Sequence, residues 1–158
     1  MIQLRDARRD ELPALSELCL RSKAVWGYDD AFMIACRIEL TLRPDELQST
    51  HIRVAERDST VVGLAQVKVT GTDADLLKLF VEPAQLGSGV GRLLFEWATA
   101  KARGLGAVRM IIEADPDAAA FYEHMGARHA GFAPSQSIAG RMLPRMQMKL
   151  EKQAELPQ

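Results

Sequence analysis

The sequence predicts a mixed α/β (α+β) sheet with helices on both faces, and three observations support this fold class. Residues 51–57, 61–70 and 76–82 have strand patterns separated only by short turns, which is typical of an antiparallel meander. A long amphipathic stretch separates residues 76–82 from the apolar run 107–114, so these two strands are expected to be parallel neighbours joined by a right-handed crossover. Two helical segments precede the meander, whereas a doubly wound nucleotide fold would alternate strand and helix from its start.

The segment before the meander is expected to hold a short strand and two helices. Residues 2–4 form the strand, and Asp10 is the expected N-cap of a helix that ends near Ser22. The inner face of this helix consists of Leu12, Leu15, Leu18, Cys19 and Ser22. A second helix is expected from residue 29 or 30 to about residue 42. In the meander itself, Gly63 indicates a possible bulge.

The composition is that of an ordinary globular protein. The chain has 158 residues, of which 47% are hydrophobic and 26% charged, so we expect one domain over residues 1–150 and a C-terminal tail over residues 151–158. The net charge is -1 without a basic block, so nucleic acid is not an expected partner. The charged start, and the lack of an apolar stretch of about 18 residues, predict a cytoplasmic protein with no membrane partner.

Cysteine and histidine usage points away from redox and metal chemistry. Cys19 and Cys36 fall in predicted helices without C-x-x-C spacing, so we expect buried, reduced thiols. None of the three histidines stands at metal-ligand spacing, so no metal site is expected.

A glycine-rich turn follows the strand 76–82 and opens directly into an amphipathic helix. Gly87, Gly89 and Gly91 leave backbone amides exposed at the helix N-terminus, where they could bind a phosphate together with Arg92. The alternative is a turn that binds nothing. A Walker loop is excluded because Arg92 and Leu93 follow the last glycine, and the spacing G-x-G-x-G departs from the dinucleotide fingerprint.

Glu39 lies among apolar residues on one face of the second helix. Burial would raise the pKa of this carboxyl toward the range of a general base that accepts a proton from an amine. The alternative is a carboxylate that pairs with an arginine, namely Arg37, Arg43 or Arg53, or one at the helix rim.

The C-terminal third is expected to contain a helix and two strands. Asp115 is the expected cap of a helix that starts with Pro116 and ends at Gly126. The strands are expected over residues 128–132 and 144–150. The polar loop between them, Ser135–Arg141, could line a substrate site or could be a simple connection.

Two stretches resemble the GCN5-related N-acetyltransferase (GNAT) family. VEPAQLGSGVGRLL resembles its motif A, a strand ending in V-x-P followed by [RQ]-x-x-G-x-[GA], with Gly89 and Gly91 on the small positions and Leu86 where Arg or Gln is usual. DPDAAAFYEHMGA is similar to a second family pattern, an Asn or Asp followed by A-x-x-F-Y-x-x-x-G, with Asp115 where Asn is common. The two motifs are about 30 residues apart in the order of the GNAT fold, and the resemblance covers roughly residues 1–150.

The resemblance implies a cofactor, acetyl-CoA, and a place for it. In the GNAT fold the strand before the glycine turn splays from the next parallel strand, and the pantetheine arm pairs with backbone groups, here those of Leu79, Phe80 and Val81. The pyrophosphate would lie over the turn and the start of the helix. The cofactor-binding residues implied are Leu79, Phe80, Val81, Leu86, Gly87, Ser88, Gly89, Val90, Gly91, Arg92 and Asp115.

The resemblance also implies the chemistry, direct acetyl transfer to a primary amine of a small molecule or peptide. A strand amide near Phe80 or Val81 would stabilise the oxyanion, and Tyr122 would protonate the departing thiolate, since phenol and thiol pKa values are close. The alternative for Tyr122 is an aromatic ring packed on the sheet with its hydroxyl on a backbone carbonyl. The acceptor pocket is expected between the first two helices and the Ser135–Arg141 loop, lined by Trp26, Tyr28, Phe32 and Glu39.

Two other functions stay open on the sequence. A non-catalytic acyl-CoA sensor would keep the glycine turn without a productive acceptor site, and Leu86 in place of Arg or Gln fits that reading. A nucleotide-binding module would instead bind ATP or NAD. A homodimer is compatible with the exposed late strands of this fold.

Overall fold

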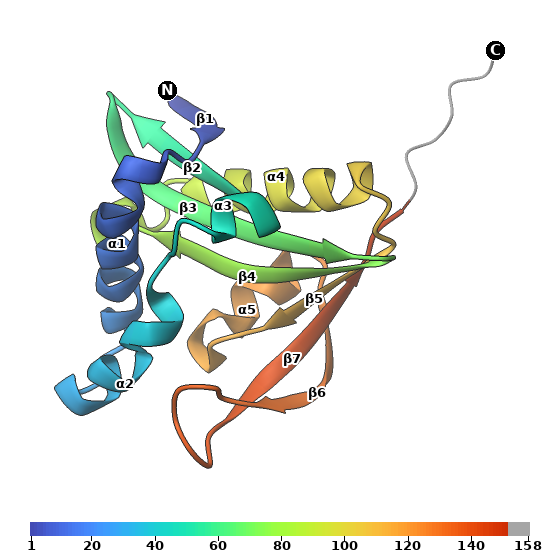
Figure 1. Cartoon of the computed structure of the whole chain (residues 1–158). Helices are drawn as coiled ribbons and strands as arrows, with labels where there is room; N and C mark the ends of the chain where they lie inside the picture. Colours follow the sequence, from blue (N-terminus) through green and yellow to red (C-terminus); the bar gives the residue numbers. More distant parts are fainter. Residues whose placement is uncertain (152–158) are drawn as a thin grey trace.

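The computed structural model describes residues 1–151 and contains a seven-stranded mixed sheet with the order β1-β2-β3-β4-β5-β7-β6 (Figure 1). The strands are β1 (Ile2–Asp6), β2 (His51–Arg57), β3 (Thr60–Thr70), β4 (Asp73–Val81), β5 (Arg109–Glu113), β6 (Arg128–Pro134) and β7 (Met142–Lys149). All neighbouring pairs are antiparallel except β4 and β5, which are parallel. The predicted sheet is therefore confirmed. The predicted tail lies outside the described residues, apart from Glu151.

Helices cover both faces of this sheet, as predicted (Figure 1). One face carries α1 (Leu12–Ala24), α2 (Asp30–Leu40) and the short α3 (Glu46–Ser49), and the other carries α4 (Val90–Gly104) and α5 (Ala119–His124). Leucines spaced three or four residues apart on α1 pack on Val54 and Leu64. Phe95 of α4 and Tyr122 of α5 pack on Met110 of β5. Cys19 and Cys36 are free, buried thiols, as expected.

The parallel strands β4 and β5 are paired only where they begin. The pairs are Asp73 with Arg109, Ala74 with Met110 and Asp75 with Ile111. Beyond them β4 continues along β3 to Val81, while β5 continues along β7 (Figure 1). The two strands therefore diverge toward their carboxyl ends, and one edge of β4 is left without a strand partner.

Two bulges interrupt the meander. Val62 has no partner on β2, which places the first bulge beside Gly63, where it was predicted. Leu77 has no partner on β3, because Gln66 pairs with Lys78 and Val67 pairs with Leu76. The period-two pattern of the sequence, with Leu77, Leu79 and Val81 on one face and Lys78 and Phe80 on the other, therefore fails only at Leu77. Leu77 is 45% exposed, and the alternation restarts after it.

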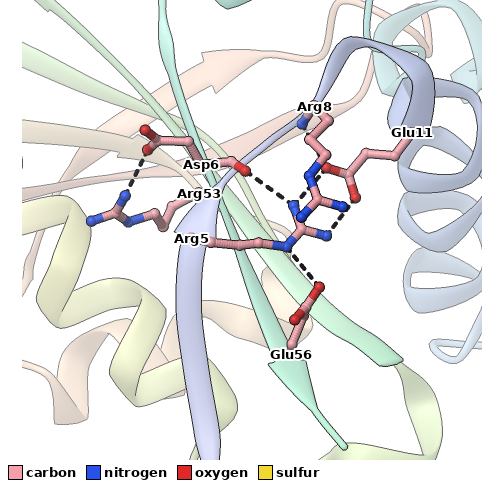
Figure 2. Close-up of polar contacts among 6 residues, drawn as sticks. All are labelled: Arg5, Asp6, Arg8, Glu11, Arg53 and Glu56. Atoms are coloured by element: carbon pink, nitrogen blue, oxygen red, sulfur yellow. Dashed lines mark hydrogen bonds and ion pairs between the residues drawn. The ribbon is translucent and has the colours of Figure 1, made fainter. Parts of the chain in front are cut away.

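A polar cluster joins β1 to the start of the first helix (Figure 2). Arg5 donates hydrogen bonds to Glu56 on β2, at 2.6 Å, and to both carboxylate oxygens of Glu11, at 2.8 Å. Glu11 also accepts a hydrogen bond from the backbone amide of Arg8. The bond from Arg5 lowers the pKa of Glu11 despite its partial burial, so this carboxylate stays ionised in the folded protein.

Some helix boundaries differ from the predictions. Arg9–Glu11 form a 3-10 turn and α1 starts at Leu12, so Asp10 is not the N-cap of that helix. The Glu11 carboxylate accepts a hydrogen bond from the Arg8 backbone amide, which stabilises this turn immediately before the helix. The helix predicted from Asp115 is divided into a 3-10 turn, Pro116–Ala118, and α5. Within residues 1–151 no helix is both long and apolar enough to cross a bilayer.

Candidate functional site

The divergence of β4 and β5 opens a cavity of about 600 Å³, within the range of small-molecule and cofactor sites. Its walls come from the edge of β4, the glycine turn, the ends of β5 and α5, and the first two helices. The predicted site residues that line it are Glu39, Leu79, Phe80, Val81, Leu86, Gly87, Gly89, Gly91, Arg92, Asp115 and Tyr122. Ser88 and Val90 do not line it: the Ser88 hydroxyl bonds to the Gln85 carbonyl, and Val90 is buried in the core.

The open edge of β4 presents backbone groups to this cavity. Backbone N–H groups point alternately to either side along a strand. The Glu82 amide donates to Val62 on β3, at 2.8 Å, so the amides of Leu79 and Val81 point to the other side, where β5 has diverged. The Val81 amide meets the Ser22 hydroxyl of α1 at 3.4 Å, a long contact. Phe80, by contrast, directs its backbone groups toward β3.

The glycine turn forms the far end of the cavity. Gly87 and Gly89 have φ values of +80° and +91°, a left-handed conformation that glycine adopts without strain. A Cβ atom at either position would meet no atom within 4 Å, so the space over the turn is open to a ligand. The first amide bonded within the helix is that of Leu93, to the Gly89 carbonyl. The preceding amides at the start of α4 are therefore the ones free to bind an anion.

Tyr122 lies on α5, between the sheet and the cavity. Its ring packs against Phe121 and Phe95, with centroid distances of 5.3 and 5.9 Å. Among the described residues the Tyr122 hydroxyl donates to no backbone carbonyl. The hydrogen bond expected if Tyr122 had only a structural role is therefore missing. Burial, and less strongly the charge of Asp115, raises the pKa of Tyr122 above its ordinary value. The phenol therefore stays protonated at neutral pH.

Asp115 gathers side chains from three separate segments at the rim of the cavity. Its Oδ2 accepts a 2.7 Å hydrogen bond from Tyr28 and lies 3.5 Å from the Lys23 ammonium and 3.6 Å from the Arg141 guanidinium. Its Oδ1 accepts from the Asp117 amide. Burial alone would raise the pKa of Asp115, but these contacts, led by the Tyr28 hydroxyl, hold it below its ordinary value.

Aromatic rings and cations complete this cluster. Tyr28 stacks on Phe32 with centroids 3.9 Å apart, and Arg141 lies over both rings and donates to the Tyr28 hydroxyl at 2.6 Å. Burial, with the bond to Asp115, raises the pKa of Tyr28 to about 12. Tyr28 and Phe32, predicted to line an acceptor pocket, are therefore side by side, but they do not line the cavity. Trp26, from the same segment, does.

Glu39 does not have the buried environment expected of a general base. It is exposed, because the buried residues of α2 are Cys36 and Leu40, and this fits the alternative of a carboxylate at the helix rim. It pairs with none of the three candidate arginines. Instead it accepts a hydrogen bond from the Ser137 hydroxyl, in the loop between β6 and β7. That loop does approach the first two helices, as predicted.

Sequence reasoning missed several polar residues that line the cavity, among them Ser22, Lys23 and Lys78. Ser22 was placed on the inner face of its helix, but it is only partly buried and reaches β4. Lys78 was expected to alternate with apolar residues on a strand face, and nothing in the sequence marked it further. Lys78 is only 8% exposed, and this burial depends on contacts between segments that are distant in the sequence.

Comparisons with known proteins agree with this geometry. The sequence profile of the acetyltransferase (GNAT) domain matches residues 48–126, half of the chain. The match runs from the start of β2 through the glycine turn to the end of α5. A search of curated protein sequences found no match.

Solved structures share the fold over nearly the whole chain. The PaiA N-acetyltransferase of Thermoplasma acidophilum, in complex with coenzyme A, has a TM-score of 0.76 and 18% identity, covering 94% of this chain and 99% of that one. A GCN5-related N-acetyltransferase of Rhodopseudomonas palustris has a TM-score of 0.80 and 20% identity, covering 94% and 95%. YncA of Salmonella typhimurium, with its cofactor acetyl-CoA, has a TM-score of 0.67 and 20% identity, covering 99% and 98%.

The profile match, the shared fold and the open β4 edge beside a glycine turn lead to one assignment. The chain belongs to the GNAT family of N-acetyltransferases.

Proposed function

We propose that this protein transfers the acetyl group of acetyl-CoA to a primary amine by direct attack, without a covalent enzyme intermediate. The observation that carries the proposal is a single cavity that joins the unpaired edge of β4 to the glycine turn of α4. An extended pantetheine arm needs backbone partners along one wall, and a pyrophosphate needs amides at the end of that wall. The cavity offers both in the required order.

The backbone of β4 and α4 would hold the cofactor. Leu79 and Val81 direct their amides to the open edge, so they are the residues suited to pair with the pantetheine arm, in place of Phe80. The amides before Leu93 and the adjacent Arg92 side chain are suited to the pyrophosphate. Acetyl-CoA, when bound, supplies the activated thioester.

Two groups, a backbone amide and a side chain, are proposed to assist the transfer. The Leu79 amide, on the part of the unpaired edge farther from the glycine turn, would stabilise the oxyanion that forms on the thioester carbonyl, and the Val81 amide, whose contact to Ser22 is long, would pair with the pantetheine arm. Tyr122 would donate its proton to the departing sulfur. Its raised pKa keeps that proton in place until transfer, and its hydroxyl is not bound to a backbone carbonyl of the described chain.

The acceptor amine is proposed to enter on the side of α1 and α2. Trp26 and Glu39 line this part of the cavity, and the β6–β7 loop closes over it through Ser137 and Arg141. Glu39 is exposed, so it would accept the proton of the amine directly or through water. Glu39→Gln is expected to slow turnover, with Glu46→Gln on the nearby α3 as the matched control.

Thermal unfolding with acetyl-CoA, free CoA, ATP and NAD tests the cofactor. A ligand at about 100 times its dissociation constant adds about 2.7 kcal/mol, which raises the midpoint by about 5–10 °C in a protein of this size. A rise with acetyl-CoA and CoA alone is expected. A rise with ATP or NAD instead would favour a nucleotide-binding module, and no rise with either CoA species would refute the proposal.

A non-catalytic acyl-CoA sensor remains the second candidate, because one observation favours it. Leu86, at the family's Arg or Gln position, is 51% exposed and offers no polar group to a phosphate. Release of CoA from acetyl-CoA in the presence of a panel of amines separates the two functions. Binding without release for any amine would support the sensor. An acetyl group trapped on Cys19 or Cys36 would contradict direct attack.

A further inference from the structure

Lys78 on β4 is a buried cation that the proposed reaction does not use. It lines the cavity, is 8% exposed and lies on the sheet face that α1 and α2 cover, next to Phe80 in the alternation. It lies immediately before the β4 segment proposed to hold the cofactor. Its position is therefore on the acceptor side of the thioester.

Among the described residues, the only hydrogen-bond partner of this ammonium is a neutral amide. Lys78 Nζ donates to Gln66 Oε1 at 3.2 Å, and within residues 1–151 it forms no ion pair. An ammonium has three donors and no acceptor, so two of its protons have no partner in this part of the chain. Burying a charge without a counter-charge costs several kcal/mol.

A chain of hydrogen bonds fixes the orientation of that amide. Gln66 Nε2 donates to the Thr50 hydroxyl at 3.0 Å, and this hydroxyl donates to the Glu46 carbonyl at 2.6 Å. The Gln66 oxygen is thereby committed to Lys78. Gln66 and Thr50 are both buried, so this hydrogen-bond chain fixes the position of the Lys78 ammonium.

Neighbouring groups do not supply the missing negative charge. Burial raises the pKa of the Cys19 thiol to about 12, so the thiol close to Lys78 is neutral. The carboxylate of Asp115 is shared by Lys23, Arg141 and Tyr28. Glu39 is exposed and bonded to Ser137.

We propose that the acceptor is an amine that also carries a carboxylate, and that Lys78 binds this carboxylate. The inference rests on the proposed acetyl transfer and names the class of its acceptor: amino acids, or peptides that present a carboxylate close to the reacting amine. Lys78 orients the acceptor and takes no part in proton transfer. Lys23, which also lines the cavity, adds to the positive potential on this side.

The test compares acceptors that differ only in this charge. Release of CoA from acetyl-CoA is measured with free amino acids, with their carboxamides and with polyamines, using the full chain. A buried charge pair that loses one partner typically costs about 30-fold or more in kcat/KM. The wild type is therefore expected to prefer at least one amino acid over its carboxamide by about 30-fold or more.

Variants assign that preference to Lys78. In Lys78→Met the ratio between acid and carboxamide is expected to fall close to one, chiefly through a higher KM for the acid. Lys78→Arg should keep part of the preference. Lys68→Met, an exposed lysine on β3 outside the cavity, should keep all of it. An unchanged acetyl-CoA midpoint shift checks that each variant folds and binds the cofactor.

The outcomes separate the inference from the proposed function. Wild-type turnover of carboxamides or polyamines as fast as of the acids overturns the inference while acetyl transfer stands. A ratio unchanged in Lys78→Met overturns it as well. If Lys78→Met does not fold, the wild-type ratio and Lys78→Arg decide. Absence of turnover with every amine overturns both proposals.

Discussion

The hydroxyl of Tyr28 is the best single place to test whether the rim cluster holds the structure together. Tyr28→Phe keeps the ring stacked on Phe32 and removes only the oxygen that lies between Asp115 and Arg141. Both bonds that disappear involve a charged group, at 2.7 and 2.6 Å. The substitution therefore isolates hydrogen bonding from packing.

The expected loss can be estimated from the burial of the cluster. Hydrogen bonds to charged groups contribute about 1.5–3 kcal/mol each. The Asp115 and Arg141 side chains are still 12% and 18% exposed, and water can replace part of both bonds, so we take the low end, about 1.5–2 kcal/mol in total. At about 2–4 °C per kcal/mol for a chain of this size, the midpoint falls by about 3–8 °C.

A double-mutant cycle with Asp115→Ala measures the pairwise part. Urea unfolding of wild type, both single variants and the double variant should give a coupling free energy of about 1 kcal/mol or more. The pKa of Asp115 is lowered in the folded protein. The contribution of its carboxylate to the free energy of unfolding is therefore complete above the unfolded pKa of 3.8 and is lost as the pH falls below that value. Additivity within about 0.3–0.5 kcal/mol at pH 7 would refute the reasoning.

Three further predictions concern the catalytic acid, the core and the N-terminal cluster. Tyr122→Phe should lower kcat about 100-fold or more while leaving the acetyl-CoA midpoint shift unchanged; equal kcat would remove Tyr122 from the mechanism. Gly63→Ala should cost about 1–3 kcal/mol in urea unfolding, because its Cβ would lie 3.0 Å from the Phe80 carbonyl and two core side chains, whereas Gly104→Ala meets no atom. In an acid titration of stability, Glu11→Gln should flatten the fall expected below about pH 4.5, since the lowered pKa of Glu11 means that its contribution to the free energy of unfolding is lost as the pH drops; an unchanged profile would exclude this role.

The features that the sequence predicted well are those encoded in neighbouring residues. The glycine turn before α4 follows from three glycines and an amphipathic pattern, and the cap at Asp115 follows from its own side chain. The parallel pairing of β4 and β5 needed only the helix between them. Each of these signals lies within a few turns of chain, so no tertiary information was required.

The features that could not be predicted join distant segments. Asp115 meets Tyr28 and Arg141, which are 87 and 26 positions away, and no local pattern records such a contact. The exposure of Glu39 depends on which face of α2 packs against the rest of the protein, and helical spacing alone does not determine that face. The burial of Lys78 depends on a bulge whose residue, Leu77, looks like any other strand leucine.

The bulge at Leu77 has a consequence for how β4 can change over time. It lets a single strand direct Ala74 and Leu76 to the α4 side and Lys78 and Phe80 to the α1 side. Deleting Leu77 would remove the bulge and leave Lys78 and Phe80 on the α1 side, whereas inserting or deleting a residue between Lys78 and Val81 would send part of the strand into the opposite core. A change of side-chain volume at the buried Ala74 or Leu76 would disturb packing at one place, but a change of length would disturb both faces. Insertions and deletions should therefore be tolerated in the flanking turns and rejected within β4, except for loss of Leu77.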